Sequence, residues 1–292
     1  MAAFEAGAEL EAGTTAAPSR RRRGLGIVFW LAVAWLGLIF GLAALANLLP
    51  LEDPTRMNLL ARRALPSLAH LLGTDSFGRD LLSRLIFGAR NSLTIGLIAP
   101  LAGLCVGGSL GLVAGYFRGR FEVITVGATD VLLAFPPLIL ALAVTAYLGQ
   151  SVVNLTAILG LLTVPPATRV ARAATLAVAQ REFVVAARAL GAGHRRILAR
   201  ALLPNVMTPL AVLFLLAVAV IIVAEGALSF LGLGVPAPAP SWGTMIAEGS
   251  TSLDIAPQIA FIPAAAMFLT VLAFNLLGDT LRALTDPRRA AP

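Results

Sequence analysis

The ionisable side chains of this chain exclude several kinds of chemistry. All 22 basic residues are arginines, whereas a Walker A phosphate loop needs a lysine on the β- and γ-phosphates of ATP. The single cysteine, Cys105, cannot form an internal disulfide or a cysteine-based metal cluster and is expected to be a small packed hydrophobe. His70 and His194 fall on opposite sides of the membrane in the topology that the arginines favour. We therefore predict no catalytic residue, bound cofactor or metal site in this chain.

Asp75 and Asp80 form the first carboxylate pair whose spacing could suit acid–base chemistry. Arg79 and Arg84 lie about one helical turn from them, and opposite charges at such spacing form ion pairs along a helix. We therefore expect intrahelical ion pairs here rather than catalysis.

Asp130 and Glu225 are carboxylates within or at the ends of apolar stretches. An ionisable group there is costly, so each must face a partner, backbone N–H groups or water. A proton-coupled carrier would need such a group near the middle of the membrane with a relay partner. Asp130 instead falls near the expected inner end of its stretch and Glu225 near the outer end, which favours structural hydrogen bonding for both.

A polar, arginine-rich insert at 182–205 separates two of the apolar stretches. Gly191-Ala192-Gly193 should end a first short helix, because glycine tolerates the left-handed conformation of a helix C-cap. A second short helix, His194 to Leu203, is expected to end before Pro204. These elements predict a helix–turn–helix projection on the membrane surface that could bind a partner. The alternative is a solvated basic loop that only orients the chain, and spacing alone does not choose between the two.

The composition indicates an integral membrane protein. Apolar residues make up 58% of the chain and charged residues 13%, against roughly 45–50% and about 25% in soluble domains. A helix needs about 20 apolar residues to cross the hydrocarbon core of a membrane. Six stretches have this length, at 25–46, 91–116, 123–149, 152–177, 206–231 and 258–280. We predict an all-α polytopic protein with six transmembrane helices.

The arginines orient these spans. Arg20 to Arg23 precede the first span, and short cytoplasmic loops favour arginine, so we expect the N-terminus inside. Six crossings return the C-terminus to the same side, and this topology puts 16 arginines inside and 6 outside. A secretory signal peptide at 20–46 is the competing interpretation. It is disfavoured because the apolar stretch is longer than a typical signal-peptide core and no clean cleavage site follows.

The predicted topology divides the chain into five parts. They are a disordered cytoplasmic tail at 1–24, an anchor helix at 25–47, an extracytoplasmic segment at 48–90, a membrane core at 91–281 that contains the cytoplasmic loop 178–208, and a cytoplasmic tail at 282–292.

The extracytoplasmic segment is predicted to contain one helix. Gly73-Thr74-Asp75 has the composition of a turn into a helix cap. After Gly78, leucine and isoleucine recur at helical spacing, with charged residues between them up to Arg90. We expect an amphipathic helix that lies at the membrane interface and leads into the second span.

Small residues and prolines shape the spans. Gly103, Gly107, Gly111 and Gly115 repeat every four residues and place a stripe of small residues on one face of the second span. Such stripes let helices pack closely in lipid, and packing within the subunit is favoured over dimerisation. The proline pairs at 136–137 and 165–166 should kink or break the third and fourth spans, because proline lacks a backbone donor.

Motifs at four places resemble one family of transport proteins. The insert carries Glu182, Ala186, Ala187, Gly191, Ile197, Pro204 and Asn205, which match the EAA loop of ABC importer permeases. The other three motifs are Gly73-Thr74-Asp75 with Gly78-Arg79-Asp80 and Ser83-Arg84; Glu225 with Leu228-Ser229, Gly232-Leu233-Gly234 and Ser241-Trp242-Gly243; and Gly278-Asp279 with Leu281-Arg282 and Asp286-Pro287-Arg288. Together they resemble the C-type permease subunit of dipeptide/oligopeptide ABC importers, from about Arg20 to Arg289. Two departures are Phe183, where tyrosine is usual, and a variant ending at 278–286.

The resemblance implies a type I ABC importer permease in the bacterial inner membrane, with both termini cytoplasmic. Its implied partners are a homologous second permease subunit, two cytoplasmic ABC ATPase subunits that bind ATP and Mg, and an extracytoplasmic binding protein. Membrane lipid surrounds it, and no nucleic acid is expected. The EAA loop would dock on an ATPase subunit, with Ala186 and Ala187 allowing close approach and Glu182 and Arg188 fixing orientation through charge-assisted hydrogen bonds. The other motifs would be structural.

The cargo is the least specified part of this interpretation. The resemblance favours di- and oligopeptides, with nickel chelates, haem, glutathione and sugars as alternatives, since cargo choice in the family lies mainly in the binding protein. An ion-coupled secondary carrier or a channel is the rival class. No internal repeat of the kind that carriers use is apparent in the sequence.

Overall fold

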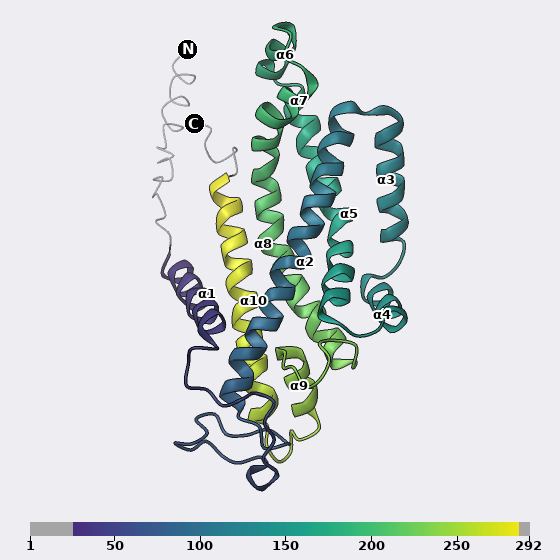
Figure 1. Cartoon of the computed structure of the whole chain (residues 1–292). Coiled ribbons are helices and arrows are strands. Elements are labelled where there is room, and N and C mark those ends of the chain that lie inside the picture. The colour runs from purple at the N-terminus through teal and green to yellow at the C-terminus, as the bar shows by residue number, and fades with distance from the viewer. Residues whose placement is uncertain (1–25, 286–292) are drawn as a thin grey trace, which may run out of the picture.

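The structure, a computed structural model, describes residues 26–285 and forms a bundle of long helices (Figure 1). The predicted tail at 1–24 and most of the tail at 282–292 lie outside the described residues. The helices are α1 Ile27–Leu45, α2 Leu81–Phe117, α3 Gly119–Leu133, α4 Pro137–Leu148, α5 Val152–Ala179, α6 Glu182–Ala189, α7 His194–Arg196, α8 Leu203–Phe230, α9 Trp242–Ser250 and α10 Gln258–Thr285, with a 3₁₀ turn at Leu59–Ala61 and a π turn at Ile197–Leu202.

Five helical stretches are long and apolar enough to cross a membrane. They are α1, α2, α5, α10 and the stretch His194–Phe230, which contains α8. Helices α3 and α4 meet the criterion only as a pair, and they are bent by 83° at the connection that contains Pro136, the N-cap residue of α4. The predicted break at this proline pair is confirmed. The described part of the chain is an all-α polytopic membrane protein with five spans, or six if the bent pair is one span.

The second proline pair has a different outcome from the one predicted. Pro165 and Pro166 lie inside the continuous helix α5, so they do not break the fourth span. Helix α5 packs along α2 in the most extensive helix contact of the described chain, and Pro165 is buried there. Neighbouring helices commonly stabilise prolines within membrane helices in this way.

Helix α2 is longer than predicted and begins outside the membrane core. The expected interfacial helix and the second span are one helix of 37 residues, so the predicted boundary at residue 90 falls inside it. Ser83 and Arg84 are buried rather than turned to the interface, because residues 52–54 and α9 cover them. The N-cap is Asp80, whose side chain accepts from the Ser83 N–H at 2.8 Å; the predicted cap at Thr74 and Asp75 is wrong.

The glycine stripe of α2 faces α5 at very short range. A Cβ atom on three of the glycines would come within 2.4 Å of a backbone carbonyl oxygen of α5, and on the fourth within 2.8 Å of a threonine side chain. The facing residues also recur every four positions, so the two backbones stay in contact over several turns. The backbone carbonyl groups that face the four glycines are those of Gly160 for Gly103, Val164 for Gly107, Thr168 for Gly111 and Arg172 for Gly115.

Most connecting segments, apart from the one between α3 and α4, lie at the two ends of the bundle (Figure 1). Residues 48–80 and α9 lie at one end, and α6 and α7 project from the other. Cys105, expected to be packed in the interior, is instead exposed on α2. The folded segments outside the long helices therefore lie at the two ends of the bundle.

Candidate functional site

The insert folds into two helical arms joined by a tight turn. The first arm, α6, is capped at Leu190, and Gly191 follows with φ +79°. The N–H groups of Gly191 and Ala192 donate to the carbonyl oxygens of Arg188 and Ala187 at 2.9 and 3.0 Å. This is the hydrogen-bond pattern of a Schellman motif, in which the left-handed residue is usually glycine. The predicted turn is present, and its backbone conformation favours glycine at 191.

Buried apolar side chains hold the two arms against the membrane helices. Val184 of α6 is 0% exposed, and Ile197 of the second arm is 2% exposed. Both belong to one cluster that includes Leu202 and Val206 at the base of α8. The arms are therefore packed onto the bundle and do not form a loose surface loop.

The second arm continues directly into a membrane span, contrary to the prediction that it ends before Pro204. Residues His194 to Phe230 form one helical stretch, and Ile197–Leu202 is its π turn. A π turn is wider than an α turn, so it can accommodate a proline that lacks an N–H and crowds the preceding turn. The second arm and α8 are therefore parts of one continuous helical stretch.

The end of α2 anchors the insert through Tyr116. Its hydroxyl lies 2.8 Å from Nδ1 of His194, and the guanidinium of Arg188 lies over its ring, 5.1 Å from the centroid. His194 is exposed, and no prediction for Tyr116 was made from the sequence. An aromatic residue at the end of an apolar span gave no signal for this contact, because its partners are 72 or more positions away along the chain.

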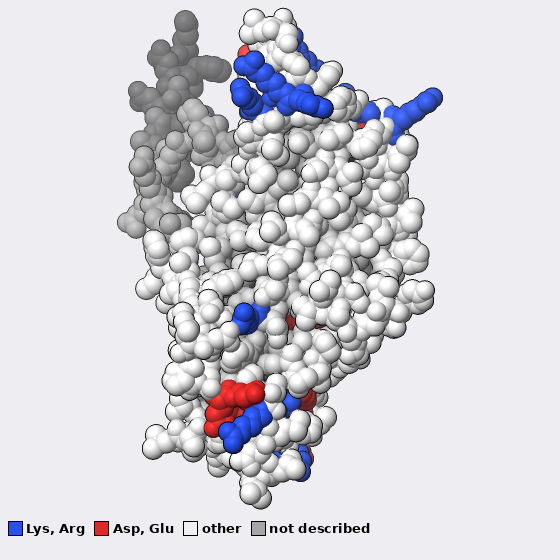
Figure 2. All heavy atoms as spheres, in the orientation of Figure 1, with Lys and Arg blue, Asp and Glu red and all other residues white. Residues whose placement is uncertain are grey.

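The outer surface of the insert carries apolar and charged groups together. Phe183, Val185 and Leu190 are 47%, 54% and 88% exposed. Within the described residues, the Glu182 carboxylate has no hydrogen bond or ion pair. Figure 2 shows basic side chains gathered at this end of the molecule. Exposed apolar side chains beside free charges are typical of a protein-binding surface.

A pocket of about 220 Å³ lies between the two arms. Of the predicted docking residues, Ala187, Ile197 and Asn205 line it, so the fold brings them together from both arms. The others lie around it: Glu182 starts α6, Ala186 is exposed on α6, Arg188 faces Tyr116, Gly191 forms the turn, and Pro204 is exposed at the base of α8. Phe183, Arg196 and Arg200 also line the pocket and were not predicted.

The opposite end of the molecule contains a buried network of ion pairs. Asp75 accepts from Nε of Arg79 at 2.6 Å and lies 3.3 Å from Nε of Arg84. Both arginines also pair with Glu248 of α9, through Nη2 of Arg84 at 3.0 Å. The predicted ion pairs of Asp75 exist, but they join a loop, α2 and α9 instead of running along one helix. Asp80 pairs with His70, whose Nδ1 is 3.1 Å from its carboxylate.

Residues that shape the turns of this segment are motif glycines. Gly73 and Gly78 have φ +81° and +75°, and a Cβ on either would collide with a backbone oxygen of residue 64 or 58. The Thr74 hydroxyl accepts from the Ala64 N–H at 2.8 Å. These residues fold the segment 48–80 onto the start of α2.

Glu225 is the centre of a second buried network. Its carboxylate accepts from the hydroxyls of Ser229 at 2.7 Å, Ser241 at 2.8 Å and Ser92 at 3.1 Å, and its side chain is fully buried. The Trp242 backbone N–H donates to Ser92, and its indole donates to the Leu85 carbonyl. Three hydroxyl groups donate to the carboxylate, and these hydrogen bonds connect α8 to α2 and α9.

The remaining residues of this motif fit the same arrangement. Gly232 has φ +79° and ends α8 with hydrogen bonds to the carbonyl oxygens of Ser229 and, from the next residue, Leu228. Gly243 packs on Gly226, where an added Cβ would come within 2.6 Å of the Gly226 Cα. Ser92 and Glu248 gave no signal in the sequence, because their partners are 133 and 164 positions away.

The ion pairs among Asp75, Arg79, Arg84 and Glu248 lead to a prediction about stability. Arg84→Ala should destabilise the protein by about 3–5 kcal/mol, because it removes one of the two arginines that pair with the buried carboxylate of Asp75 and the partly exposed carboxylate of Glu248. Arg90→Ala is the matched control on the same helix, since Arg90 is exposed and has no ion pair within the described residues; we expect a change within about 0.5 kcal/mol. Thermal unfolding of the detergent-solubilised variants measures both. Equal midpoints would contradict a stabilising network.

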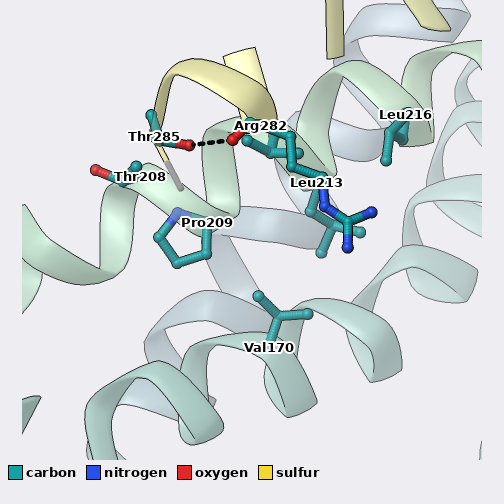
Figure 3. A pocket seen from close by; sticks show the side chains of 8 residues that line it. Val170, Thr208, Pro209, Leu213, Leu216, Arg282 and Thr285 are labelled. Atoms are coloured by element: carbon teal, nitrogen blue, oxygen red, sulfur yellow. Dashed lines mark hydrogen bonds between the residues drawn. The ribbon is translucent and has the colours of Figure 1, made fainter. Parts of the chain in front are cut away.

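The C-terminal motif lies at the same end as the insert, beside a pocket of about 570 Å³ (Figure 3). Arg282 of α10 extends across this pocket toward Leu213 of α8, and Val170 of α5 forms its opposite wall. The Thr285 hydroxyl donates to the Arg282 carbonyl at 3.2 Å. Asp279 is exposed one turn earlier. The motif residues thus lie far from the networks around Asp75 and Glu225 and close to the base of the insert.

These features define a multi-span membrane protein with a folded, partner-accessible insert at one end. The chain belongs to the family described as binding-protein-dependent transport system inner membrane component, whose model matches residues 107–291. It is therefore an inner-membrane permease of a binding-protein-dependent ABC importer, and the predicted family is confirmed.

Several relatives are glutathione transport system permease proteins GsiD. Those of Pectobacterium atrosepticum, Escherichia coli O157:H7 and Shigella sonnei are each 43% identical to this chain over 223 residues, which cover 76% of this chain and 74% of the relative.

Proposed function

We propose that this chain forms, with a second permease subunit, the translocation path of an ATP-driven importer of short peptides. Glutathione, itself a tripeptide, is the first cargo to test, because the relatives above carry it in their names. An extracytoplasmic binding protein would deliver the cargo, and the chain itself would catalyse no reaction.

The continuity of the insert with α8 is the observation that carries the coupling role. Two cytoplasmic ATPase subunits would bind ATP and Mg, and one would hold the insert through the exposed apolar side chains and the free Glu182 carboxylate. Movement of the ATPase would then move α8 through the helical stretch His194–Phe230. In this proposal the insert and both termini lie in the cytoplasm.

Uptake of radiolabelled glutathione tests the cargo. Cells that produce the importer should accumulate glutathione, and deletion of this chain should reduce uptake to background. Excess unlabelled dipeptide should compete, whereas a nickel chelate or a sugar should not. Competition by a nickel chelate or sugar alone would replace the peptide proposal with that cargo.

A further inference from the structure

A pair of charged residues lies on the surface of two membrane-spanning elements. Nη2 of Arg169 on α5 lies 2.6 Å from Oδ1 of Asp130 on α3, and the two side chains are 56% and 51% exposed. A second pair, Arg172 with Glu122, joins the same helices closer to the C-terminal end of α5 and the N-terminal end of α3, and its side chains are only 36% and 18% exposed. Asp130 and Arg169 lie at the seam where α3 contacts α5. Their side chains are therefore accessible to whatever surrounds this seam.

The depth of the open pair can be estimated from helix length. Arg169 lies ten residues before the end of α5, about 15 Å along the axis, and Asp130 lies eleven residues after the start of α3, about 16 Å. Helix α5 is about 42 Å long and exceeds a core of roughly 30 Å by about 12 Å. Even if the whole excess lay on the cytoplasmic side, the Arg169 backbone would be within the membrane.

The backbone next to this pair is also incompatible with lipid. Helix α3 ends at Leu133, and the connection Ala134–Pro136 is non-helical and exposed. Irregular backbone at membrane depth occurs only where protein buries it or where it lines a water-filled cavity. Exposed charges at this depth obey the same restriction. Two independent features therefore exclude lipid from the seam between α3 and α5.

The exposed surface near α1 differs from the seam between α3 and α5. Between the two ends of the molecule, the surface in Figure 2 is mainly uncharged, apart from a small charged patch. Apolar side chains such as Leu38 of α1 are exposed among the long helices, as expected for contact with lipid.

We propose that the seam at Asp130 and Arg169 lines the water-filled translocation path and binds the charged groups of a zwitterionic cargo. This inference rests on the proposed function. A cargo carboxylate would pair with Arg169 and a cargo ammonium group with Asp130. The exposed pair would thereby be exchanged for two ion pairs with the cargo, whereas the more buried Glu122 and Arg172 would remain joined.

Cysteine labelling tests whether water reaches the seam. Gly127 is exposed one turn before Asp130 and has no atom within 4 Å of an added Cβ, so Gly127→Cys leaves the charged pair intact. The background is Cys105→Ala, and Leu38→Cys, 53% exposed on α1, is the lipid-facing control. In inside-out vesicles that contain the assembled importer, a charged methanethiosulfonate should modify position 127 at least about tenfold faster than position 38. Slow modification at both positions would overturn the proposal and would indicate that the partner permease covers the seam.

Uptake kinetics test the contact with cargo. Asp130→Asn with Arg169→Gln removes both charges but keeps hydrogen-bonding groups, and it should raise KM for glutathione about tenfold with little change in maximal uptake. Glu122→Gln with Arg172→Gln is the matched control, because it removes an ion pair between the same helices, and KM should stay unchanged. An unchanged KM in the first variant, or an equal rise in both, would refute the cargo contact. Failure of the wild-type importer to take up glutathione would instead refute the proposed cargo, while the labelling result would still decide whether the seam lines a path.

Discussion

Glu182→Arg and Gly191→Trp should each reduce cargo uptake to background while the protein stays in the membrane. Glu182→Arg reverses the charge at a position whose carboxylate has no partner within the described residues. The second puts a large side chain on a backbone with φ +79°, at the exposed turn of the insert. Neither position lies in a membrane span, so insertion should be normal. Uptake and co-purification of the ATPase subunits measure the outcome.

Gly193 provides a matched control for the turn. It lies two residues from Gly191, also has open space around an added Cβ, but has φ −67°. Gly193→Ala should therefore transport normally, whereas Gly191→Ala should be impaired, since a left-handed conformation costs a non-glycine residue about 1–2 kcal/mol. Wild-type uptake and wild-type ATPase retention in both Glu182→Arg and Gly191→Trp would show that the insert only orients the chain, because both variants keep its positive charge.

Gly107→Leu should prevent formation of a stable bundle. Its Cβ would lie 2.4 Å from the carbonyl oxygen of Val164 and 2.9 Å from the Cβ of Ala167, and backbone atoms cannot rotate away. The two helices would have to separate along the stripe, at a cost of about 3 kcal/mol or more. Thermal stability in detergent and the amount of monodisperse protein measure this effect.

Gly127→Leu is the control for helix propensity and added bulk. Gly127 also lies in a helix of the apolar region, but nothing is within 4 Å of an added Cβ. We expect unchanged or slightly higher stability, because leucine is the better helix former. Equal thermal midpoints for the two leucine variants would mean that α2 and α5 do not pack along the stripe as described.

Local features of the sequence were sufficient to predict the long apolar helices, the break at Pro136, the turn at Gly191 and the family. The long apolar stretches predicted membrane helices, since length and composition alone satisfy the hydrocarbon core. Pro136 predicted a break in the third span, because a missing N–H and a fixed φ act on the residue itself and its neighbours. The turn at Gly191 was predicted for the same reason: its left-handed conformation depends on the absence of a side chain.

Contacts between distant residues could not be predicted in this way. Glu248 gave no signal that it would join Arg79 and Arg84, and Ser92 gave none that it would donate to Glu225, because hydrogen-bond partners at such separations are chosen by how helices pack. The interfacial helix was wrong for a related reason. Leu81 and Arg84 have amphipathic spacing whether their surroundings are a membrane surface or a covering of loop and α9, and only packing distinguishes the two.

The sequence by itself determined that this chain is an importer permease and predicted an EAA-type insert, through motif residues whose order needs no fold. Only the tertiary structure decided how the insert meets the membrane. Pro204 predicted a helix end, yet the π turn at Ile197–Leu202 lets the second arm run into α8. The exposure of Asp130 and Arg169 was likewise decided by tertiary structure. The ionic contact and the open side of the seam both depend on how α3 lies against α5. Local propensity acts over a few residues, whereas these features depend on the relative placement of whole helices.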